Sequence, residues 1–224
     1  MSKLNELDEL TDLSGSTSEN NEPVHVNVVI CTPGHSVMGP YLKSLLMTIQ
    51  HLSSNGISWA YSNEYSSMVS DAREMTLSGT AHNTISQRKP FEGKLTYDKL
   101  MWIDSDIAWS VEDFMNLYES DKDIVSGAYM LATGEVMAYE KIMHKPYNYD
   151  NIKHATELMK IEAAGFGFIC IKQGVFESLT RPWFQTTTGK FVDESTGESF
   201  DFPIMGEDVS FCKRIMDLGY EMWL

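Results

Sequence analysis

Lys99-Leu100-Met101-Trp102-Ile103-Asp104-Ser105-Asp106-Ile107 is an apolar run that ends in two aspartates one residue apart. The run predicts a buried strand that carries Asp104 and Asp106 to its end. Residues two apart in an extended chain point the same way, so both carboxylates would face one side. Two neighbouring anionic oxygen donors suit a hard divalent cation, which can in turn hold a diphosphate. Asp104 and Asp106 also fit ordinary turn residues that close a strand, and Asp-x-Asp by itself favours this alternative.

Strand and helix patterns alternate along the chain on both sides of this run. Val24–Cys31 is apolar and β-branched and predicts a strand, which the polar turn Thr32-Pro33-Gly34 separates from a helical pattern. The elements predicted up to residue 130 are a strand over 24–31, a helix over 41–49, a strand over 56–61 with its loop at 62–65, a helix over 69–79, the central strand, a helix over 110–119 and a strand over 123–129. Such alternation predicts an α/β fold with a mostly parallel central sheet and helices on both faces.

The second half of the chain loses this regular alternation. The elements predicted there are strands over 157–162 and 166–171, a hairpin within 186–202, a helix over 206–219 and a strand from 220 onward. These elements predict a smaller mixed region beside the main sheet.

The composition is that of a single acidic globular domain. The 224 residues contain 17 Lys and Arg against 32 Asp and Glu, a formal net charge of −15. This balance argues against nucleic acid or an anionic membrane surface as a non-specific partner, because both attract cationic proteins. A nucleotide ligand stays compatible, since a bound cation can reverse the local sign of the charge.

The chain shows no pattern of a membrane or secreted protein. No apolar run approaches the roughly 18 residues of a membrane span, and the N-terminus has no apolar signal-peptide core. Cys31, Cys170 and Cys212 lie far apart in apolar contexts and predict small core residues rather than a disulfide framework. We expect a cytoplasmic protein whose residues 1–22 form a disordered acidic tail.

Three further stretches carry candidate functional residues. Arg73 lies among apolar neighbours in a predicted helix, where it is either a snorkelling surface arginine or a guanidinium that pairs with a carboxylate or phosphate at the sheet edge. Gly165-Phe166-Gly167 lacks the third glycine of a dinucleotide fingerprint, and its glycines would let a ligand or a neighbouring strand approach the backbone. Glu207 and Asp208 open the last helix, a placement that the helix dipole alone explains.

In this order the motifs resemble those of the GT-A glycosyltransferases, most closely the family-2-type enzymes and their viral or phage relatives. The resemblance covers residues 24–224 and rests on five segments: Val28-Val29-Ile30-Cys31-Thr32-Pro33, Asp71-Ala72-Arg73, Trp102-Ile103-Asp104-Ser105-Asp106, Gly165-Phe166-Gly167-Phe168 and Gly206-Glu207-Asp208-Val209-Ser210-Phe211. The Asp-Ser-Asp strand end and the Gly-Glu-Asp helix start are the more specific pieces.

The resemblance implies a single Rossmann-like GT-A domain over residues 23–224. Residues 23–130 would be its nucleotide-sugar-binding half and residues 131–224 its acceptor-binding half. The implied activity is metal-dependent transfer of a sugar, of the hexosyltransferase kind, from a UDP- or GDP-linked donor to a hydroxyl of a glycan or protein-linked acceptor. A viral member would act in the host cytoplasm.

The resemblance also implies a role for each matched residue. Asp106 would bind Mn²⁺ or Mg²⁺ directly, and Asp104 would face the ribose or reach the metal through water. Asp208 would be the general base, with Glu207 as the competing candidate. The residues implied to bind the nucleotide-sugar are Thr32, Pro33, Gly34, Asn63, Arg73, Asp104, Ser105, Gly165, Phe166 and Gly167.

The chain departs from the family pattern at its end. Relatives often place a further metal ligand just beyond the strand that starts here at Tyr220, whereas this chain stops at Leu224. Either the chain is truncated, or His144, His154 or a water takes that position. Whether the transfer inverts or retains configuration stays open.

Two alternatives to a transferase of this kind also stay open. One is a domain that binds nucleotide-sugars but has lost transfer. The other is a nucleotidyltransferase, although the turn Thr32-Pro33-Gly34-His35 lacks the Arg or Lys such enzymes need. The aromatic residues of the second half, Tyr139, Tyr147, Trp183 and Phe184, fit either a sugar-stacking acceptor site or a core.

Overall fold

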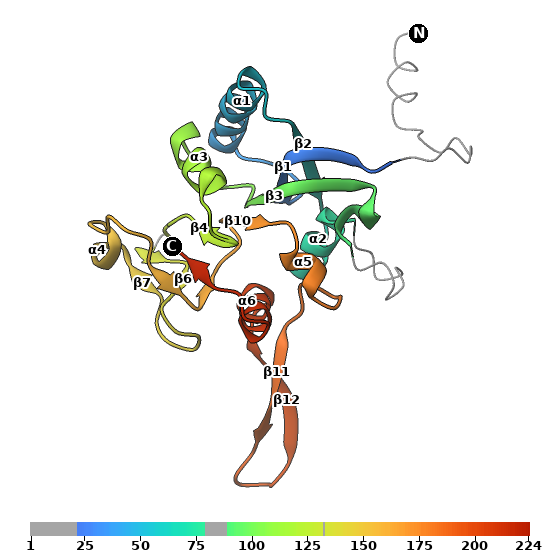
Figure 1. Cartoon of the computed structure of the whole chain (residues 1–224). Coiled ribbons are helices and arrows are strands. Elements are labelled where there is room, and N and C mark those ends of the chain that lie inside the picture. Colours follow the sequence, from blue (N-terminus) through green and yellow to red (C-terminus); the bar gives the residue numbers. More distant parts are fainter. Residues whose placement is uncertain (1–21, 79–88, 132) are drawn as a thin grey trace, which may run out of the picture.

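A seven-stranded sheet of order β2-β1-β3-β10-β4-β13-β8 forms the centre of the molecule (Figure 1). The computed structural model describes residues 22–78, 89–131 and 133–224, the side chain of Phe200 excepted, so the predicted tail lies almost wholly outside the described residues. The strands of the sheet are β1 Val24–Pro33, β2 Trp59–Glu64, β3 Leu95–Ile103, β4 Ile124–Ser126, β8 Lys160–Ile161, β10 Phe168–Lys172 and β13 Met222–Trp223.

The sheet is mixed, which corrects the prediction of a mostly parallel one. β1 pairs in parallel with β2 and β3, and β4 pairs in parallel with β13. β10 is antiparallel to both β3 and β4, and β8 is antiparallel to β13. The chain enters β10 at the edge where β3 ends, and β10 therefore runs back antiparallel to β3.

Helices cover both faces of the sheet, as the sequence predicts (Figure 1). Val28 and Ile30 of β1 face one way and pack with α1 and α3, whereas Val29 and Cys31 face the other way and pack in the cluster that includes α5 and α6. This alternation is the two-residue period of a strand buried on both sides. The helices are α1 Gly39–Ser54, α2 Val69–Thr76, the 3-10 turn η2 Pro90–Gly93, α3 Val111–Glu119, α4 Tyr149–Ile152, α5 Val175–Ser178 and α6 Glu207–Asp217.

β2 extends further than predicted, because residues 62–64 belong to the strand and not to a loop. Thr32 of β1 pairs with Asn63, and Pro33 pairs with Glu64. β1 itself runs to Pro33, so it offers partners for these residues. The extension carries Asn63 to the same sheet edge as the end of β1.

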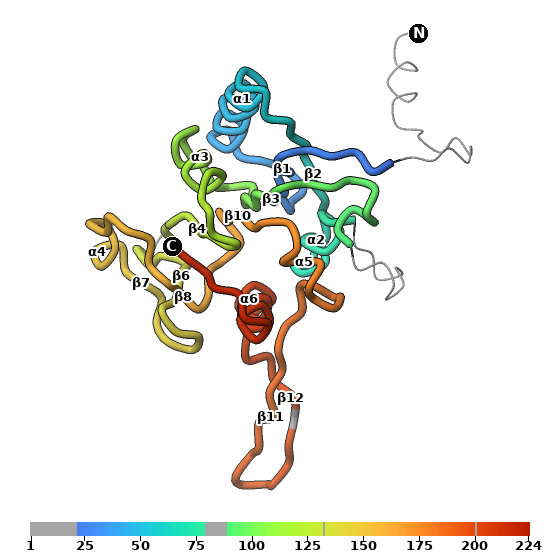
Figure 2. The backbone as a smooth tube through the Cα atoms, viewed as in Figure 1, coloured from blue at the N-terminus to red at the C-terminus, as the bar shows by residue number. Residues whose placement is uncertain are grey.

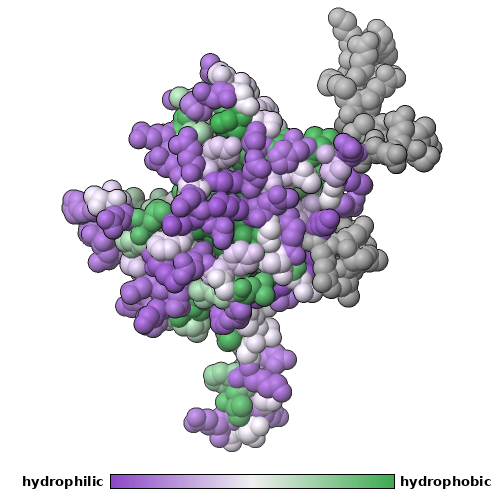
Figure 3. All heavy atoms as spheres, in the orientation of Figure 1, coloured by the Kyte–Doolittle hydropathy of each residue, from purple (hydrophilic) through white to green (hydrophobic). Residues whose placement is uncertain are grey.

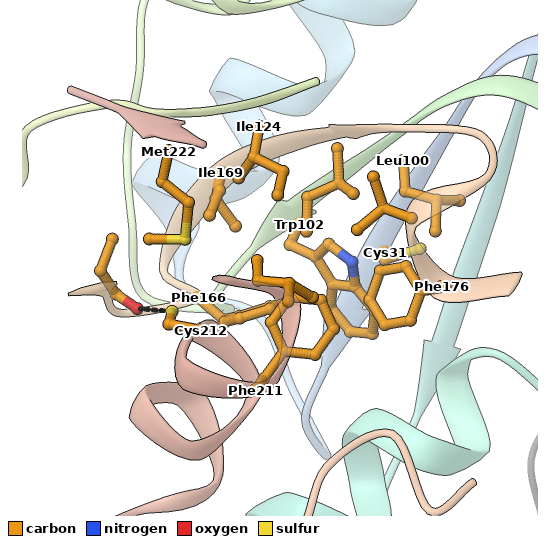
Figure 4. Close-up of a cluster of buried hydrophobic side chains, with 14 of the residues drawn as sticks. Cys31, Leu100, Trp102, Ile124, Phe166, Ile169, Phe176, Phe211, Cys212 and Met222 are labelled. Carbon is orange, nitrogen blue, oxygen red and sulfur yellow. Dashed lines mark hydrogen bonds between the residues drawn. The ribbon is translucent and has the colours of Figure 1, made fainter. Parts of the chain in front are cut away.

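An aromatic cluster fills the core on the α6 side of the sheet (Figure 4). Trp102 contacts Phe166 with ring centroids 5.6 Å apart, and Phe166 contacts Phe211 at 5.0 Å. Trp183 and Phe184 are 1% and 3% exposed, which places both in the core rather than on an acceptor surface. All three cysteines are buried and free, as predicted, and the Cys212 thiol donates to the Ala164 carbonyl at 3.5 Å (Figure 4).

The second half contains small strand pairs and one long hairpin. The pairs are β5 Glu135–Val136 with β7 Tyr147–Asn148, and β6 Ala138–Tyr139 with β9 Ala163–Ala164. The predicted hairpin is confirmed as β11 Thr187–Val192 and β12 Ser199–Met205, and it projects from the body (Figure 2). Apolar side chains gather on it, including the exposed Phe191, Phe202 and Ile204 (Figure 3). Within the described ranges, no helix combines the length and apolar character needed to cross a membrane.

Candidate functional site

One edge of the sheet collects most of the predicted site residues. β1, β2 and β3 run in the same direction, so Pro33, Glu64 and Asp104 lie at the edge where these strands end. β10 runs the opposite way and starts there, directly after Gly167, and β4 ends there before Gly127. Open α/β sheets bind ligands at this edge.

Arg73 lies at the centre of this edge and is 4% exposed. Its Nη1 donates to Glu207 Oε1 at 2.5 Å, and its Nη2 lies 3.5 Å from Asp104 Oδ1. The guanidinium carbon sits 5.3 Å from the centroid of the Phe166 ring. These contacts confirm an arginine that pairs with carboxylates and rule out a snorkelling surface side chain. The Nε of Arg73 is buried and has no hydrogen-bond partner among the residues described.

Asp104, Asp106 and Asp208 lie close enough together, beside Arg73, to interact electrostatically. Burial raises the pKa of Asp104, Arg73 lowers it, and the carboxylates of Asp106 and Asp208 raise it again. Asp104 therefore takes up its proton, and loses its ion pair with Arg73, at a higher pH than a free aspartate would. The sequence placed Asp104 and Asp208 about a hundred residues apart, and the fold brings them together.

The carboxylates fit a cation that protein and ligand hold together. In the described part of the chain, no three His, Cys, Asp or Glu side chains are arranged to bind a metal ion, and His144 and His154 are both exposed. An all-protein cage therefore does not fit. Mg²⁺ is usually held by one or two carboxylates plus the phosphates of a substrate, and Asp104 and Asp106 are the two carboxylates that could take part in such a site.

The turn after β1 is fixed by its own hydrogen bonds. The side-chain nitrogen of Asn63 donates to the carbonyls of Thr32 at 2.6 Å and Gly34 at 3.0 Å. Gly34 has φ +146°, and a Cβ on it would lie 3.0 Å from the Ser105 Oγ. Thr32 and Pro33 are buried, so their side chains shape the turn. Gly34 and Ser105 are the partly exposed members of this group.

Tyr129 occupies the space beside Gly165 and Gly167, where we expected a ligand. A Cβ on Gly165 would lie 2.2 Å from the Tyr129 Oη, and one on Gly167 would lie 2.6 Å from the Tyr129 ring. The Gly167 N–H donates to this oxygen at 3.1 Å. Gly165, Phe166 and Gly167 are buried, and it is Tyr129 that lies against the two glycines. The two glycines predicted that some group lies close to the backbone here, but the sequence does not identify that group as Tyr129.

Tyr129 also faces the acidic cluster. Burial raises the pKa of its phenol, and the carboxylates of Asp104 and Asp208 raise it further. The hydroxyl therefore keeps its proton, and among the described residues no acceptor is found for that proton. Tyr129 is a functional candidate that the sequence patterns missed.

Glu74 is a second missed residue and has a structural role. It is 7% exposed, and its carboxylate accepts from Arg181 Nη2 at 3.0 Å and from the Phe184 N–H at 2.7 Å. These bonds tie α2 to the segment that leads into the hairpin. A single glutamate in a helix carries no sequence signal for such a contact.

Glu207 and Asp208 have different surroundings although they are adjacent. The Glu207 side chain is 15% exposed and forms an ion pair with Arg73. Asp208 Oδ1 accepts from the Val209 N–H at 2.7 Å, and no ion pair with a cation is found for it in the described residues. Of these two residues, Asp208 is therefore the one whose carboxylate stays available to a ligand.

Gly165→Ala is expected to lower the free energy of unfolding by about 1–3 kcal/mol, because the added methyl overlaps the Tyr129 hydroxyl. Urea denaturation measures the change. In a Tyr129→Phe background the penalty should shrink, since the overlapping oxygen is gone. Gly39→Ala is the control, because nothing lies within 4 Å of its Cβ position. An equal penalty in both backgrounds would contradict this packing.

Comparisons with known proteins support the fold and leave the family unassigned. No protein-family model matches the chain, and no curated protein matches it. Among solved structures, the crystal structure of A197 from STIV, a viral protein, is similar with a TM-score of 0.52 and 18% sequence identity. The match covers 88% of this chain and 80% of A197. At this identity the similarity shows a shared α/β fold and nothing more specific.

Proposed function

We propose that the protein transfers a sugar from a nucleoside-diphosphate-sugar to an acceptor hydroxyl in a metal-dependent reaction. The observation that carries the proposal is the gathering of Asp104, Asp106 and Asp208 around the buried Arg73 at the carboxyl edge of the sheet. Such an edge suits a nucleotide, and such a carboxylate group suits a cation on its diphosphate. The resemblance to GT-A enzymes supports the same function.

The proposed transfer divides two tasks between the carboxylates. The acceptor oxygen bonds to the anomeric carbon of the donor while the bond from that carbon to the diphosphate oxygen breaks, and the bonding electrons leave with the diphosphate. Mn²⁺ or Mg²⁺, when bound, would offset this charge as a Lewis acid. Asp106, which is exposed, and Asp104 are the proposed ligands on the protein side.

Asp208 is the proposed acceptor of the proton that the attacking hydroxyl loses. A base must lie within hydrogen-bond reach of that hydroxyl. Asp208 is close enough to Asp104 to affect its pKa and has no cation partner in the described chain, whereas Glu207 is held by Arg73. The donor would be UDP- or GDP-linked, and the acceptor a glycan or protein-linked hydroxyl.

The second candidate is a nucleotide-sugar-binding domain without transfer. The observation that favours it is that, across residues 22–78, 89–131 and 133–224, no third protein ligand joins Asp104 and Asp106. Both candidates predict nucleotide binding, and turnover separates them.

Nucleoside diphosphates with Mn²⁺ are expected to raise the melting temperature of the wild-type protein. In Asp106→Asn the metal-dependent part of this shift should disappear, because a proposed ligand has lost its charge. Differential scanning fluorimetry with UDP, GDP and ADP, each with Mn²⁺ or with EDTA, measures both effects.

Glu157→Gln is the matched control, since Glu157 is an exposed carboxylate located before β8 and away from the acidic cluster. It should behave as the wild type does. No shift with any nucleoside diphosphate would refute the donor site, and an unchanged metal-dependent shift in Asp106→Asn would refute the assigned ligand.

A further inference from the structure

A cavity of about 280 Å³ lies beside the acidic cluster, between α3 and the chain that follows β4. Ile107 lines it and follows Asp106 directly, so the cavity adjoins the proposed metal site. Other residues of its wall are Trp109, Asn116, Leu117, Gly127 and Phe168.

Tyr129 connects the cavity to the acidic cluster. Tyr129 is one of the residues that line the cavity, and its hydroxyl lies against Gly167 and within the electrostatic reach of Asp104 and Asp208. The Tyr129 side chain fits in this position because residues 165 and 167 are glycines. A Cβ at either residue would overlap it.

The walls of the cavity indicate the chemistry of its ligand. The rings of Trp109 and Phe168 are stacked, with centroids 6.2 Å apart, and give the cavity an apolar wall. Asn116 is exposed at the rim, and the Asp113 carboxylate is already bonded to Ser110. No cationic side chain is found among the described residues that line it. An anion such as a phosphate would therefore be disfavoured.

We propose that this cavity is the acceptor subsite and that it takes a neutral sugar ring. Apart from Phe168, its lining residues lie within 107–129, so the proposal places the acceptor in the half that was expected to bind the donor. A sugar ring has an apolar face that packs on aromatic walls and hydroxyls that bond to polar groups at the rim. The ring would present one hydroxyl past Tyr129, which donates to it, and that hydroxyl would pass its proton to Asp208 as its oxygen bonds to the donor's anomeric carbon. The assignment of the ring as an acceptor rests on the proposed transfer function.

Saturation-transfer NMR with the methyl glycosides of glucose, galactose, mannose and N-acetylglucosamine tests the subsite without needing turnover. At least one glycoside should bind the wild-type protein. Asn116→Trp should weaken that binding at least tenfold, because the indole fills the cavity from the exposed face of α3. Glu119→Trp is the matched control, since Glu119 is exposed on the same helix and does not line the cavity.

Tyr129→Phe keeps the ring and removes the proton donor, and it should weaken the same binding about tenfold, the cost of one hydrogen bond. The subsite is refuted if no glycoside binds the wild type, or if Asn116→Trp binds as tightly as Glu119→Trp. A melting shift with a nucleoside diphosphate and Mn²⁺ alongside such a result would show that only the subsite fails. Glycoside binding lost in Asn116→Trp, together with no consumption of any nucleotide-sugar, would refute transfer while leaving the sugar site in place.

Discussion

Arg73→Met is expected to lower the free energy of unfolding by about 3–5 kcal/mol, the largest stability loss we predict for one substitution. Methionine keeps much of the apolar volume that packs on Phe166, so the loss reports the missing charge. Glu207 is 15% exposed and would remain as a buried carboxylate without its cation. Asp104 would lose the guanidinium that lowers its pKa.

Urea denaturation at neutral pH measures this loss, which for a chain of this size corresponds to a fall in melting temperature of roughly 10 °C. Arg73→Met combined with Glu207→Gln should recover part of the stability, because the negative charge of Glu207, which Arg73→Met leaves unpaired, is removed as well. Arg73→Lys should be intermediate, since an ammonium keeps the charge but lacks the planar fork that reaches both carboxylates. A loss below about 1 kcal/mol, the range of exposed ion pairs, would show that Arg73 does not hold the site together.

Asp208→Asn is expected to reduce sugar transfer by about 10²–10⁴-fold, the usual contribution of a general base. The amide has the same shape and can still accept the bond from the Val209 N–H, so the start of α6 should be preserved. The melting shift with nucleoside diphosphate and Mn²⁺ should therefore remain. Transfer and donor hydrolysis are measured by release of the nucleoside diphosphate.

Glu207→Gln is the matched variant, because the two acids are adjacent on the same turn of α6. We expect this variant to lose stability through Arg73, and to lose less activity than Asp208→Asn at a temperature where both are folded. If Glu207→Gln abolished transfer and Asp208→Asn did not, the roles of the two carboxylates would be reversed.

Local patterns predicted the elements that build the sheet edge. An apolar, β-branched run predicted β1, an apolar run predicted β3, and helical spacing predicted α1 and α6, because each of these elements buries a face of its own. The predicted helix over 110–119 corresponds to α3, which begins with a capping box between Ser110 and Asp113 in the structure. Asp104 directly follows the buried strand β3, as predicted. The extended two-residue period does not continue to Asp106, which corrects the prediction that both carboxylates face one side: Ser105 and Asp106 lie in a turn in which the Ile107 N–H donates to the Asp104 carbonyl at 3.0 Å.

Those local patterns did not predict which distant segments of the chain contact each other. The antiparallel direction of β10 depends on where the chain enters the sheet, which no strand pattern contains. Tyr129 and Glu74 gain their roles from partners 38 and 110 residues away. Phe166 and Trp183 were candidates for ligand contact, but their size and apolar character serve the core equally well, and only packing decides between the two.

Turnover of a nucleotide-sugar is the most direct test of the account. The wild-type protein is incubated with UDP- and GDP-linked sugars, Mn²⁺ and the methyl glycosides, and the released nucleoside diphosphate and the new glycoside are measured together by chromatography. The account predicts that one donor is consumed, that the release depends on Mn²⁺, and that Asp106→Asn abolishes it. Nucleoside diphosphate binding in the wild type without consumption of any donor would contradict a transferase and favour a binding domain.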